Sequence, residues 1–427
     1  MSKNQPIRVC FFSKYPPIEG GVSSRTYWLS RALGEKGVEV HIVTNALEVE
    51  EEYREILDLN EPSNKKEYEP KNVFVHSLNS NQNHSGVPFH IPFSPAYLER
   101  LISLGIRVIE KYGCNLIDSH YLQPYGIAAV FAKFLTSKPC ILRNAGSDIS
   151  RLFPKEDFHD LYKASFKIAD IIITQIKNKD VFGDSSISQD KLWTSPFHSI
   201  PPQHFNPKVK PANLANFGIP PKLLKKPVLT YIGKCTLYKC LFDLAKVASQ
   251  IKEDFLLLFI AKGSKLEELK AYLKRFPSLK NKYYFLDFLP PWQIPSVLRA
   301  STCLLQLETG FPVKGHRPIQ PIEAFATATP ALISQELFQK YKNIYSSNLK
   351  KDKNVLAVNP QDHFDLKNVL LRIVRNPRKI KQIGRRGHRE LFDEKEFENG
   401  VEDRISLYRK MLRDQLSPSS RLRNAEY

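Results

Sequence analysis

Two lysines that follow an apolar run have a spacing suited to binding phosphate. Lys234 comes just after the run Val228–Ile232 and one glycine, and Lys239 follows five residues later. The run predicts a strand, and two ammonium groups beyond a strand end could clamp a diphosphate and stabilise the charge that grows when it leaves. The chain is rich in lysine, so two exposed lysines without a ligand would explain the same spacing. Both interpretations remain open from spacing alone.

Two carboxylates lie at positions where they could hold hydroxyl groups. Glu308 follows the apolar run Cys303–Leu307, and Glu323 begins a predicted helix after two prolines. A carboxylate there accepts hydrogen bonds from hydroxyls, while the amides at a helix start favour a phosphate. Glu323 could equally serve only to complement the helix dipole. Between the two acids, Gly315 would permit close backbone approach and His316 supplies a ring donor.

The first half of the chain carries polar residues after two further strand-like runs. His120 ends the run Leu116–Ser119, while Asn144 and Asp148 follow Cys140–Arg143. Side chains at the carboxyl ends of parallel strands lie at the edge where ligands bind. For Asp148, a role as the N-cap of a short helix is the alternative.

Several motifs of other chemistries are missing. Gly20-Gly21 separates the first strand-like run from the first helical pattern, where it could let a ligand approach the backbone or simply form a tight turn. It is not the Gly-x-Gly-x-x-Gly fingerprint, which counts against a nicotinamide oxidoreductase. There is no Asp-x-Asp pair at a strand end, no P-loop, no Gly-x-Ser-x-Gly and no zinc signature, so we expect no metal. The six cysteines form no Cys-x-x-Cys pair, which favours a reducing, cytoplasmic compartment.

The elements that position these residues alternate between strand and helix. Ile7–Ser13, a helix that ends near Gly37 and the strand Val38–Val43 form a βαβ unit, and a second alternating block begins at Pro227. The sequence therefore predicts an α/β protein with two Rossmann-like domains that face a cleft. The predicted divisions are a first domain at 1–200 with a long excursion at 47–86, a proline-rich linker at 201–226, a second domain at 227–396, a terminal helix at 397–416 and a disordered tail at 417–427.

The net charge of +19 and the pI of about 9.5 suggest a polyanionic partner. Phosphate-bearing substrates, an anionic membrane surface and nucleic acid all qualify, and a solvated surface without a partner is the alternative. Nucleic acid ranks last, because the basic residues are scattered and do not form one stripe with interleaved aromatics. No apolar run is long enough to span a bilayer, and the first residues do not resemble a signal peptide. We expect a cytoplasmic protein that can bind peripherally at the inner face of the membrane.

Taken together, the motifs resemble those of the family 4 retaining glycosyltransferases of the GT-B fold, over about Ile7 to Leu412. Gly20-Gly21 is similar to the family's donor-facing glycine loop, and Gly233-Lys234 with Lys239 is similar to its diphosphate clamp. The turn that contains Gly263 resembles its Gly-x-Gly-Pro turn. Glu323-Ala324-Phe325-Ala326 looks like the second half of its Glu-x7-Glu motif.

The resemblance implies a hexosyltransferase-type enzyme that uses a UDP- or GDP-linked sugar, needs no metal or other cofactor and retains the anomeric configuration. The second domain would bind the nucleotide sugar, with Glu323 on the ribose, Lys234 and Lys239 on the diphosphate, and Glu308 or the Gly315-His316 backbone on the sugar. The first domain would bind a glycan or lipid-linked acceptor near His120, as in polysaccharide or lipopolysaccharide biosynthesis. The last helix would cross back to the first domain.

Four departures from the family pattern qualify this resemblance. The clamp arginine is Lys234, and the glycine after the clamp lysine is Cys240. Glu308 lies fifteen residues before Glu323 rather than eight, and Asn144 stands in place of a histidine. A non-catalytic nucleotide-sugar or glycan-binding protein with a degenerate GT-B fold is therefore the main alternative. An epimerase or phosphorylase of the same fold is a further one.

Overall fold

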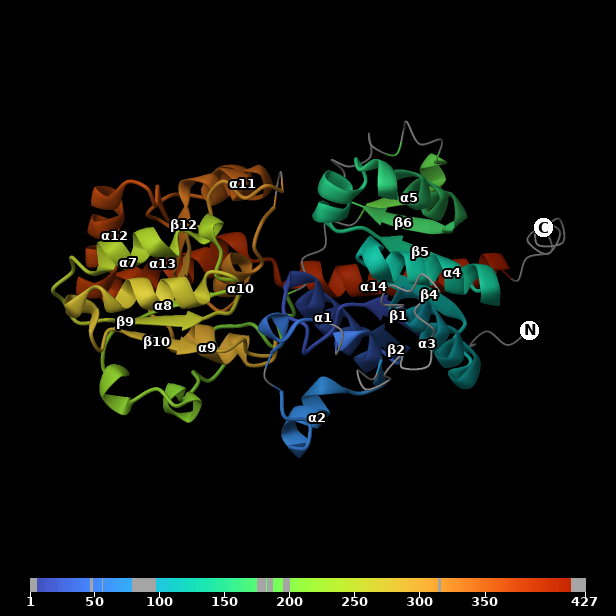
Figure 1. The fold of residues 1–427 in the computed structure, drawn as a ribbon, viewed down its shortest axis with the longest axis horizontal. Coiled ribbons are helices and arrows are strands. Elements are labelled where there is room, and N and C mark those ends of the chain that lie inside the picture. The colour runs from blue at the N-terminus through green and yellow to red at the C-terminus, as the bar shows by residue number, and fades with distance from the viewer. Residues whose placement is uncertain are drawn as a thin grey trace, which may run out of the picture. The chain divides into compact units, whose positions relative to one another are not determined.

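The computed structural model describes residues 6–46, 49–55, 57–78, 97–174, 182, 187–194, 200–313 and 316–415. The chain divides into two compact units, Met1–Ser199 with Lys395–Tyr427 and Ile200–Glu394 (Figure 1). Each unit has its own parallel sheet covered by helices, as the alternating pattern predicts. The predicted tail at 417–427 lies outside the described residues.

Unit 1 is built on a seven-stranded parallel sheet with the order β3-β2-β1-β4-β5-β6-β7. The strand order reverses between β1 and β4, where Ser13 pairs in register with His120. Such a switch point is where open α/β sheets bind ligands. The strands are β1 (Arg8–Ser13), β2 (Glu39–Thr44), β3 (Val73–Ser77), β4 (Leu116–His120), β5 (Cys140–Arg143), β6 (Ile171–Thr174) and β7 (Leu192–Thr194).

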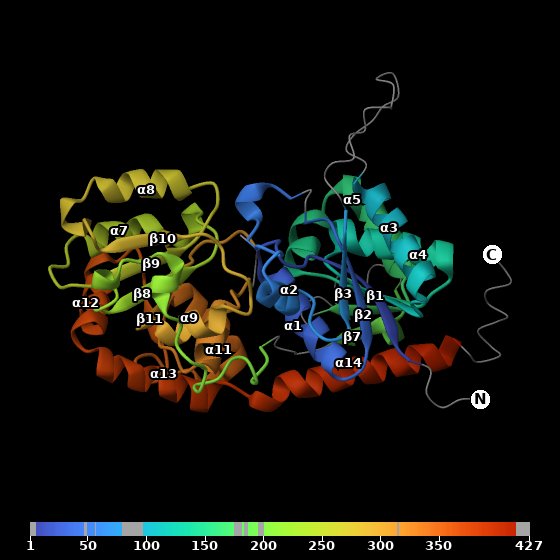
Figure 2. The ribbon, with the colours of Figure 1, turned by 90° about the horizontal axis from the view of Figure 1, so that it is seen from below.

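Helices α3, α4 and α5 contribute apolar side chains to one buried core cluster of this sheet. Helix α14 returns from the end of the chain to unit 1, as the resemblance implies, and Figure 2 shows it running alongside α1. Arg404 of α14 forms a buried ion pair with Asp118 of β4, and Tyr408 donates a hydrogen bond to the same carboxylate. The helices of unit 1 are α1 (Gly21–Glu35), α2 (Pro62–Tyr68), α3 (Tyr97–Tyr112), α4 (Ile127–Thr136), α5 (Glu156–Ile168) and α14 (Glu394–Gln415).

The predicted excursion at 47–86 is more ordered than its sequence suggests. Its described part contains α2 and the strand β3, which pairs with β2 at the edge of the sheet. The strand escaped prediction because it alternates only weakly: Val73 is buried, Phe74 is exposed, and the next three residues are half-buried.

Unit 2 has a six-stranded parallel sheet with the order β10-β9-β8-β11-β12-β13. Its central strands β8 and β9 are buried throughout, as expected for strands covered on both faces. The strands are β8 (Val228–Ile232), β9 (Leu256–Ile260), β10 (Tyr283–Leu286), β11 (Cys303–Gln306), β12 (Ala331–Ser334) and β13 (Leu356–Val358). The helices are α7 (Leu241–Ala248), α8 (Leu266–Lys274), α9 (Ile294–Ala300), α10 (Gln320–Ala326), α11 (Gln335–Tyr345), α12 (His363–Arg375) and α13 (Pro377–Leu391).

The proline-rich segment 201–226 belongs to unit 2 and is not a separate linker. Leu214, Ile219 and Leu223 are buried, and the Tyr284 hydroxyl donates a 2.9 Å hydrogen bond to the carbonyl of Gly218. The prolines prevent long helices here but not packing, because short 3₁₀ turns still place apolar side chains in the core. None of the described helices is long and apolar enough to cross a membrane.

Candidate functional site

The sheet of unit 2 changes strand order between β8 and β11, and candidate residues follow both strands. Lys234 and Lys239 come after β8, and Glu308 comes after β11. The two strands are direct neighbours, and the side chain of Gln306 donates a 2.7 Å hydrogen bond to the carbonyl of Ile232. The sheet therefore brings segments some seventy residues apart to one edge, where a ligand is expected.

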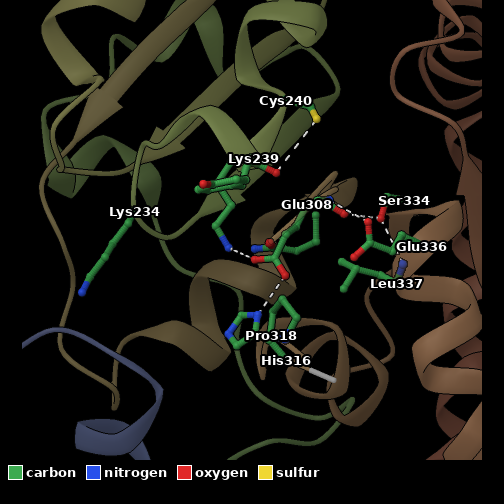
Figure 3. Close-up of polar contacts among 12 residues, drawn as sticks. Lys234, Lys239, Cys240, Glu308, His316, Pro318, Ser334, Glu336 and Leu337 are labelled. Carbon is green, nitrogen blue, oxygen red and sulfur yellow. Dashed lines mark hydrogen bonds and ion pairs between the residues drawn. The ribbon is translucent and has the colours of Figure 1, made fainter. Parts of the chain in front are cut away.

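At this edge, Glu308 joins Lys239 and His316 (Figure 3). The Glu308 side chain is fully buried; one oxygen forms an ion pair with the Lys239 ammonium, and the other lies 2.8 Å from His316 Nδ1. Burial alone would raise the pKa of Glu308, but the hydrogen bond from His316 and the charge of Lys239 outweigh it, so the pKa lies below its usual value. Glu308 is thus a carboxylate at neutral pH.

The loop after β11 is held in place by contacts on both sides. The amide of Gly310 donates to the Glu336 carboxylate at 2.7 Å, and that of Thr309 donates to the carbonyl of Tyr238 at 2.8 Å. The Phe311 ring packs against the His316 ring with centroids 4.3 Å apart. These contacts order the loop around Glu308. Gly315, the other candidate in this loop, lies outside the described residues.

The two predicted clamp lysines do not converge. In Figure 3 the amine of Lys234 points away from the group formed by Lys239, Glu308 and His316. The backbone of Lys234 is fixed, since its carbonyl accepts a 2.7 Å hydrogen bond from the Tyr231 hydroxyl. Of the pair, Lys239 is the one that the structure places beside the predicted sugar-binding acid.

Glu323 lies in α10 and is only 4% exposed. Burial raises its pKa to about 8. Within the described part of the chain, no donor forms a hydrogen bond with its carboxyl group, so hydrogen-bonding capacity remains for a ligand hydroxyl.

Two residues of unit 2, Gly263 and Cys240, have backbone conformations with positive φ. Gly263 belongs to the turn that resembles the family's Gly-x-Gly-Pro turn, and Cys240 is one of the departures from the family pattern. Gly263 has φ +121°, and a Cβ there would lie 3.1 Å from the carbonyl oxygen of Cys235, so a side chain would be strained and crowded. Cys240, which replaces the family's glycine after the clamp lysine, has φ +52°. Cys240 thus has a left-handed conformation, which glycine adopts more readily than residues with a side chain.

In unit 1, His120 and the glycine loop lie at the switch point of the sheet. His120 is 2% exposed, and burial lowers its pKa well below the usual value, helped by the charges of Arg143, Arg25 and Arg404. The imidazole is therefore neutral at physiological pH. Gly20 and Gly21 begin α1, and an added Cβ at either would meet no atom within 4 Å.

Asp148 connects the loop after β4 and the loop after β5 through hydrogen bonds to backbone amides. One of its oxygens accepts hydrogen bonds from the amides of Ala145 at 2.7 Å and Leu122 at 3.1 Å. Asp148 lies inside the turn whose N-cap is Ser147, so the N-cap alternative is wrong. Burial raises its pKa to about 6, against the effect of the two amide hydrogen bonds. Its second oxygen and Oδ1 of Asn144 are buried, and neither has a hydrogen-bond partner among the residues that the structure describes.

One residue of unit 1 was missed from the sequence. Arg143 ends β5 and is 9% exposed, next to His120. The sequence does contain a signal for this residue, because Arg143 is the last residue of an otherwise apolar strand. The polar residues that follow it, Asn144 and Asp148, were selected instead. Among the described residues, no group of three or more histidine, cysteine, aspartate or glutamate side chains could hold a metal ion.

Comparison with known proteins assigns the region that contains Lys239, Glu308 and Glu323. Residues 215–390 match the family described as glycosyl transferases group 1. The matched residues lie within unit 2. An uncharacterized glycosyltransferase of Methanocaldococcus jannaschii is 30% identical over 142 residues, which are 33% of this chain and 33% of the relative. The matched stretch thus spans about a third of that curated relative.

Solved glycosyltransferase structures extend the likeness to the fold of the whole chain. Sucrose-phosphate synthase from Thermosynechococcus elongatus has a TM-score of 0.60 at 16% identity and covers 96% of this chain and 100% of its own. HepE of Anabaena, in complex with UDP and glucose, has a TM-score of 0.63 at 12% identity and covers 94% and 99%. A glycosyltransferase from Rickettsia africae has a TM-score of 0.61 at 13% identity and covers 96% and 99%. The fold is that of the GT-B glycosyltransferases.

Proposed function

We propose that this protein is a glycosyltransferase that moves a sugar from a UDP- or GDP-linked donor to a glycan or lipid-linked acceptor. The donor binds to unit 2, and the acceptor to unit 1 around His120 and Asn144. The observation that carries the proposal is the contact between Lys239 and Glu308 at the switch point of a glycosyltransferase domain. That contact places a cation for phosphate beside a carboxylate for sugar hydroxyls.

Lys239 can serve both the protein and the donor. An ammonium group has three donors, so Lys239 can keep its bond to Glu308 and still donate to the donor diphosphate. It then offsets the charge that develops on the leaving nucleotide. Its ion pair with Glu308 holds the ammonium in position before the donor arrives.

Glu308 and Glu323 have different tasks in this proposal. Glu308 is ionised and accepts hydrogen bonds from sugar hydroxyls, which strengthen as the sugar approaches an oxocarbenium-like state. Glu323 is buried and largely protonated in the free protein, and it binds the ribose. The neutral imidazole of His120 lies on the acceptor side, where it can exchange hydrogen bonds with an acceptor hydroxyl.

We further propose that the reaction retains the anomeric configuration and needs no metal. Lys239 would offset the charge of the diphosphate, with Lys234 as a second cation on the same loop, a role that a divalent cation plays in other transferases. The test is turnover of UDP- and GDP-sugars in excess chelator, with the product's anomeric configuration read by NMR. Loss of activity in chelator, restored by a divalent cation, would contradict metal independence. An inverted product would contradict retention. Donor binding without transfer or donor hydrolysis would instead support the non-catalytic alternative.

A patch on unit 1 supports peripheral binding to an anionic membrane at the cytoplasmic face. Helix α4 exposes Phe131, Phe134 and Leu135, and the neighbouring α5 exposes Leu161 and Ile168. The exposed fraction of Phe134 is 73%. Lys163 and Lys167 lie on α5, whereas Lys133 of α4 forms a 2.7 Å ion pair with Asp170. Aromatic side chains flanked by lysines suit a surface with anionic headgroups and an apolar interior.

Phe134→Ser should weaken co-sedimentation with liposomes that contain anionic lipid, and added salt should weaken it further. Phe364→Ser is the matched control, because Phe364 is 77% exposed on unit 2. Binding of the wild type that is insensitive to lipid charge and salt would refute the membrane proposal.

A further inference from the structure

An excess of positive charge gathers at the acceptor side of unit 1. Arg143 ends β5 and lies next to His120, the last residue of β4; the amide of Tyr121 donates a 3.0 Å hydrogen bond to the carbonyl of Arg143. Arg25 lies in the second turn of α1, and its charge acts on both His120 and Arg143. Three neighbouring elements thus contribute to one group at the switch point of the sheet.

The arginines of this group differ in how they are neutralised. Arg404 is paired with Asp118, whose carboxylate also accepts from the Tyr408 hydroxyl. Arg143 is 9% exposed, yet its guanidinium has neither a hydrogen bond nor an ion pair with any residue that the structure describes. Burial, together with the charges of Arg404 and Arg25, lowers the pKa of Arg143 to about 9, against the smaller opposing effects of Asp118 and Tyr408. A buried cation beside like charges is costly unless something anionic binds to it.

The start of α1 offers further donors at the same place. No side chain caps this helix, no acidic residue lies in its first turn, and Gly20 and Gly21 leave open space beside it. The free amides of a helix N-terminus bind anions, and a guanidinium fork matches two oxygens of a phosphate.

We propose that unit 1 binds a phosphate group of the acceptor through Arg143, with Arg25 and the first amides of α1 as additional donors, although the resemblance implies that the Gly20-Gly21 loop faces the sugar donor. The acceptor is therefore a phosphorylated sugar or a lipid-linked phosphate. Assignment to the acceptor rests on the proposed function, in which the donor diphosphate has its own cation, Lys239, in unit 2. A phosphate bound by Arg143 should accordingly coexist with a bound nucleoside diphosphate.

The test is calorimetric titration of the full chain with inorganic phosphate, at constant ionic strength, without UDP and with saturating UDP. The wild type should bind phosphate in both conditions. Arg143→Met should weaken the binding about ten-fold or more, as expected for the loss of charge-assisted hydrogen bonds. Arg151→Met, at an exposed position of the same unit, is the matched control and should change nothing.

Three results would overturn the proposal: no phosphate binding by the wild type, unchanged binding by Arg143→Met, or displacement of phosphate by UDP, which would assign the site to the donor. If Arg143→Met fails to fold, Arg25→Gln replaces it and should weaken phosphate binding in the same way. A failure of the proposed function can be told apart from a failure of this phosphate site. Should UDP and GDP not bind while phosphate binding still depends on Arg143, the anion site stands without a donor site.

Discussion

Each unit has a largely buried cation close to the switch point of its sheet, Lys239 in unit 2 and Arg143 in unit 1, and the two differ in what surrounds them. In unit 2, the ammonium of Lys239 is paired with Glu308, a fully buried carboxylate that also accepts from His316. In unit 1, the guanidinium of Arg143 forms no ion pair with any residue that the structure describes, and the nearby charges of Arg404 and Arg25 outweigh that of Asp118. One site is electrically balanced before its ligand binds, and the other is not.

The difference indicates how each cation is used. A lysine held by a carboxylate keeps a fixed position, and the ligand must share it, which suits a diphosphate that is released at every turnover. An unpaired arginine instead gains its partner only when an anion binds, which makes an anionic group a requirement for tight binding. Substitutions at the two sites should therefore affect stability in opposite directions.

The largest effect should follow removal of Lys239. Lys239→Met leaves the carboxylate of Glu308 buried without its cation, and breaking one side of such a pair costs about 3–5 kcal/mol. Urea unfolding measures the loss. The double variant Lys239→Met/Glu308→Gln, which removes both charges, should recover most of it. Equal loss in the single and double variants would mean that the ion pair does not hold this edge together.

Glu308→Gln should affect turnover more than binding. Loss of a group that acts on charge in the transition state lowers kcat by about 10²–10³-fold. Affinity for UDP should stay the same or rise, because one negative charge beside the diphosphate is removed. Steady-state kinetics and UDP titration measure the two quantities, and Glu268→Gln, on the exposed surface of α8, is the control. A parallel fall in both would place Glu308 in nucleotide binding instead.

Glu323 should make stability depend on pH. Its pKa is about 8 in the folded protein and near 4.5 in the unfolded chain. Between these values the folded state binds the extra proton, so this group lowers stability as pH rises from about 5 to 8. Glu323→Gln should remove that decline and be more stable than the wild type at pH 8, by about 4 kcal/mol. Identical pH dependence of the two unfolding curves would show that Glu323 is ionised in the folded protein.

Arg143→Met should have the smallest effect on stability, and in the opposite direction from Lys239→Met. Removing a buried cation that lacks a partner should raise the free energy of unfolding by about 1 kcal/mol in phosphate-free buffer. Chemical unfolding of wild type and variant measures the change. A clear loss of stability would show that Arg143 already has a stabilising partner in the folded protein.

The overall fold could be predicted from local patterns, because buried parallel strands are apolar along their whole length. The run at β9 fits this pattern throughout, those at β8 and β11 fit it except for Thr230 and Gln306, and the two-domain prediction is confirmed. Edge strands carry less signal, which is why β3 was missed. The segment 201–226 was misassigned as a linker. A high proline content indicates that a segment lacks regular helices and strands, but it does not indicate that the segment is unpacked.

The candidate site could be predicted as a set of residues but not as a set of contacts. The positions of Glu308 and Lys239 after strands follow from sequence, whereas their ion pair joins residues far apart in the chain. The direction of the Lys234 side chain and the hydrogen bonds of Asp148 are set by tertiary packing, and spacing carries no information about either. Arg143 was not identified as a candidate from the sequence, because its burial is known only from the structure.

The claim that unit 2 binds a donor diphosphate through Lys239 is tested most directly by titration with UDP and uridine in chelator. The titration uses the double variant Lys239→Met/Glu308→Gln, because Lys239→Met alone would leave the buried carboxylate of Glu308 without its ion-pair partner and destabilise the fold. Compared with Glu308→Gln alone, it should bind UDP about ten-fold or more weakly and uridine with unchanged affinity. Equal losses for UDP and uridine, or no UDP binding by the wild type, would contradict the account.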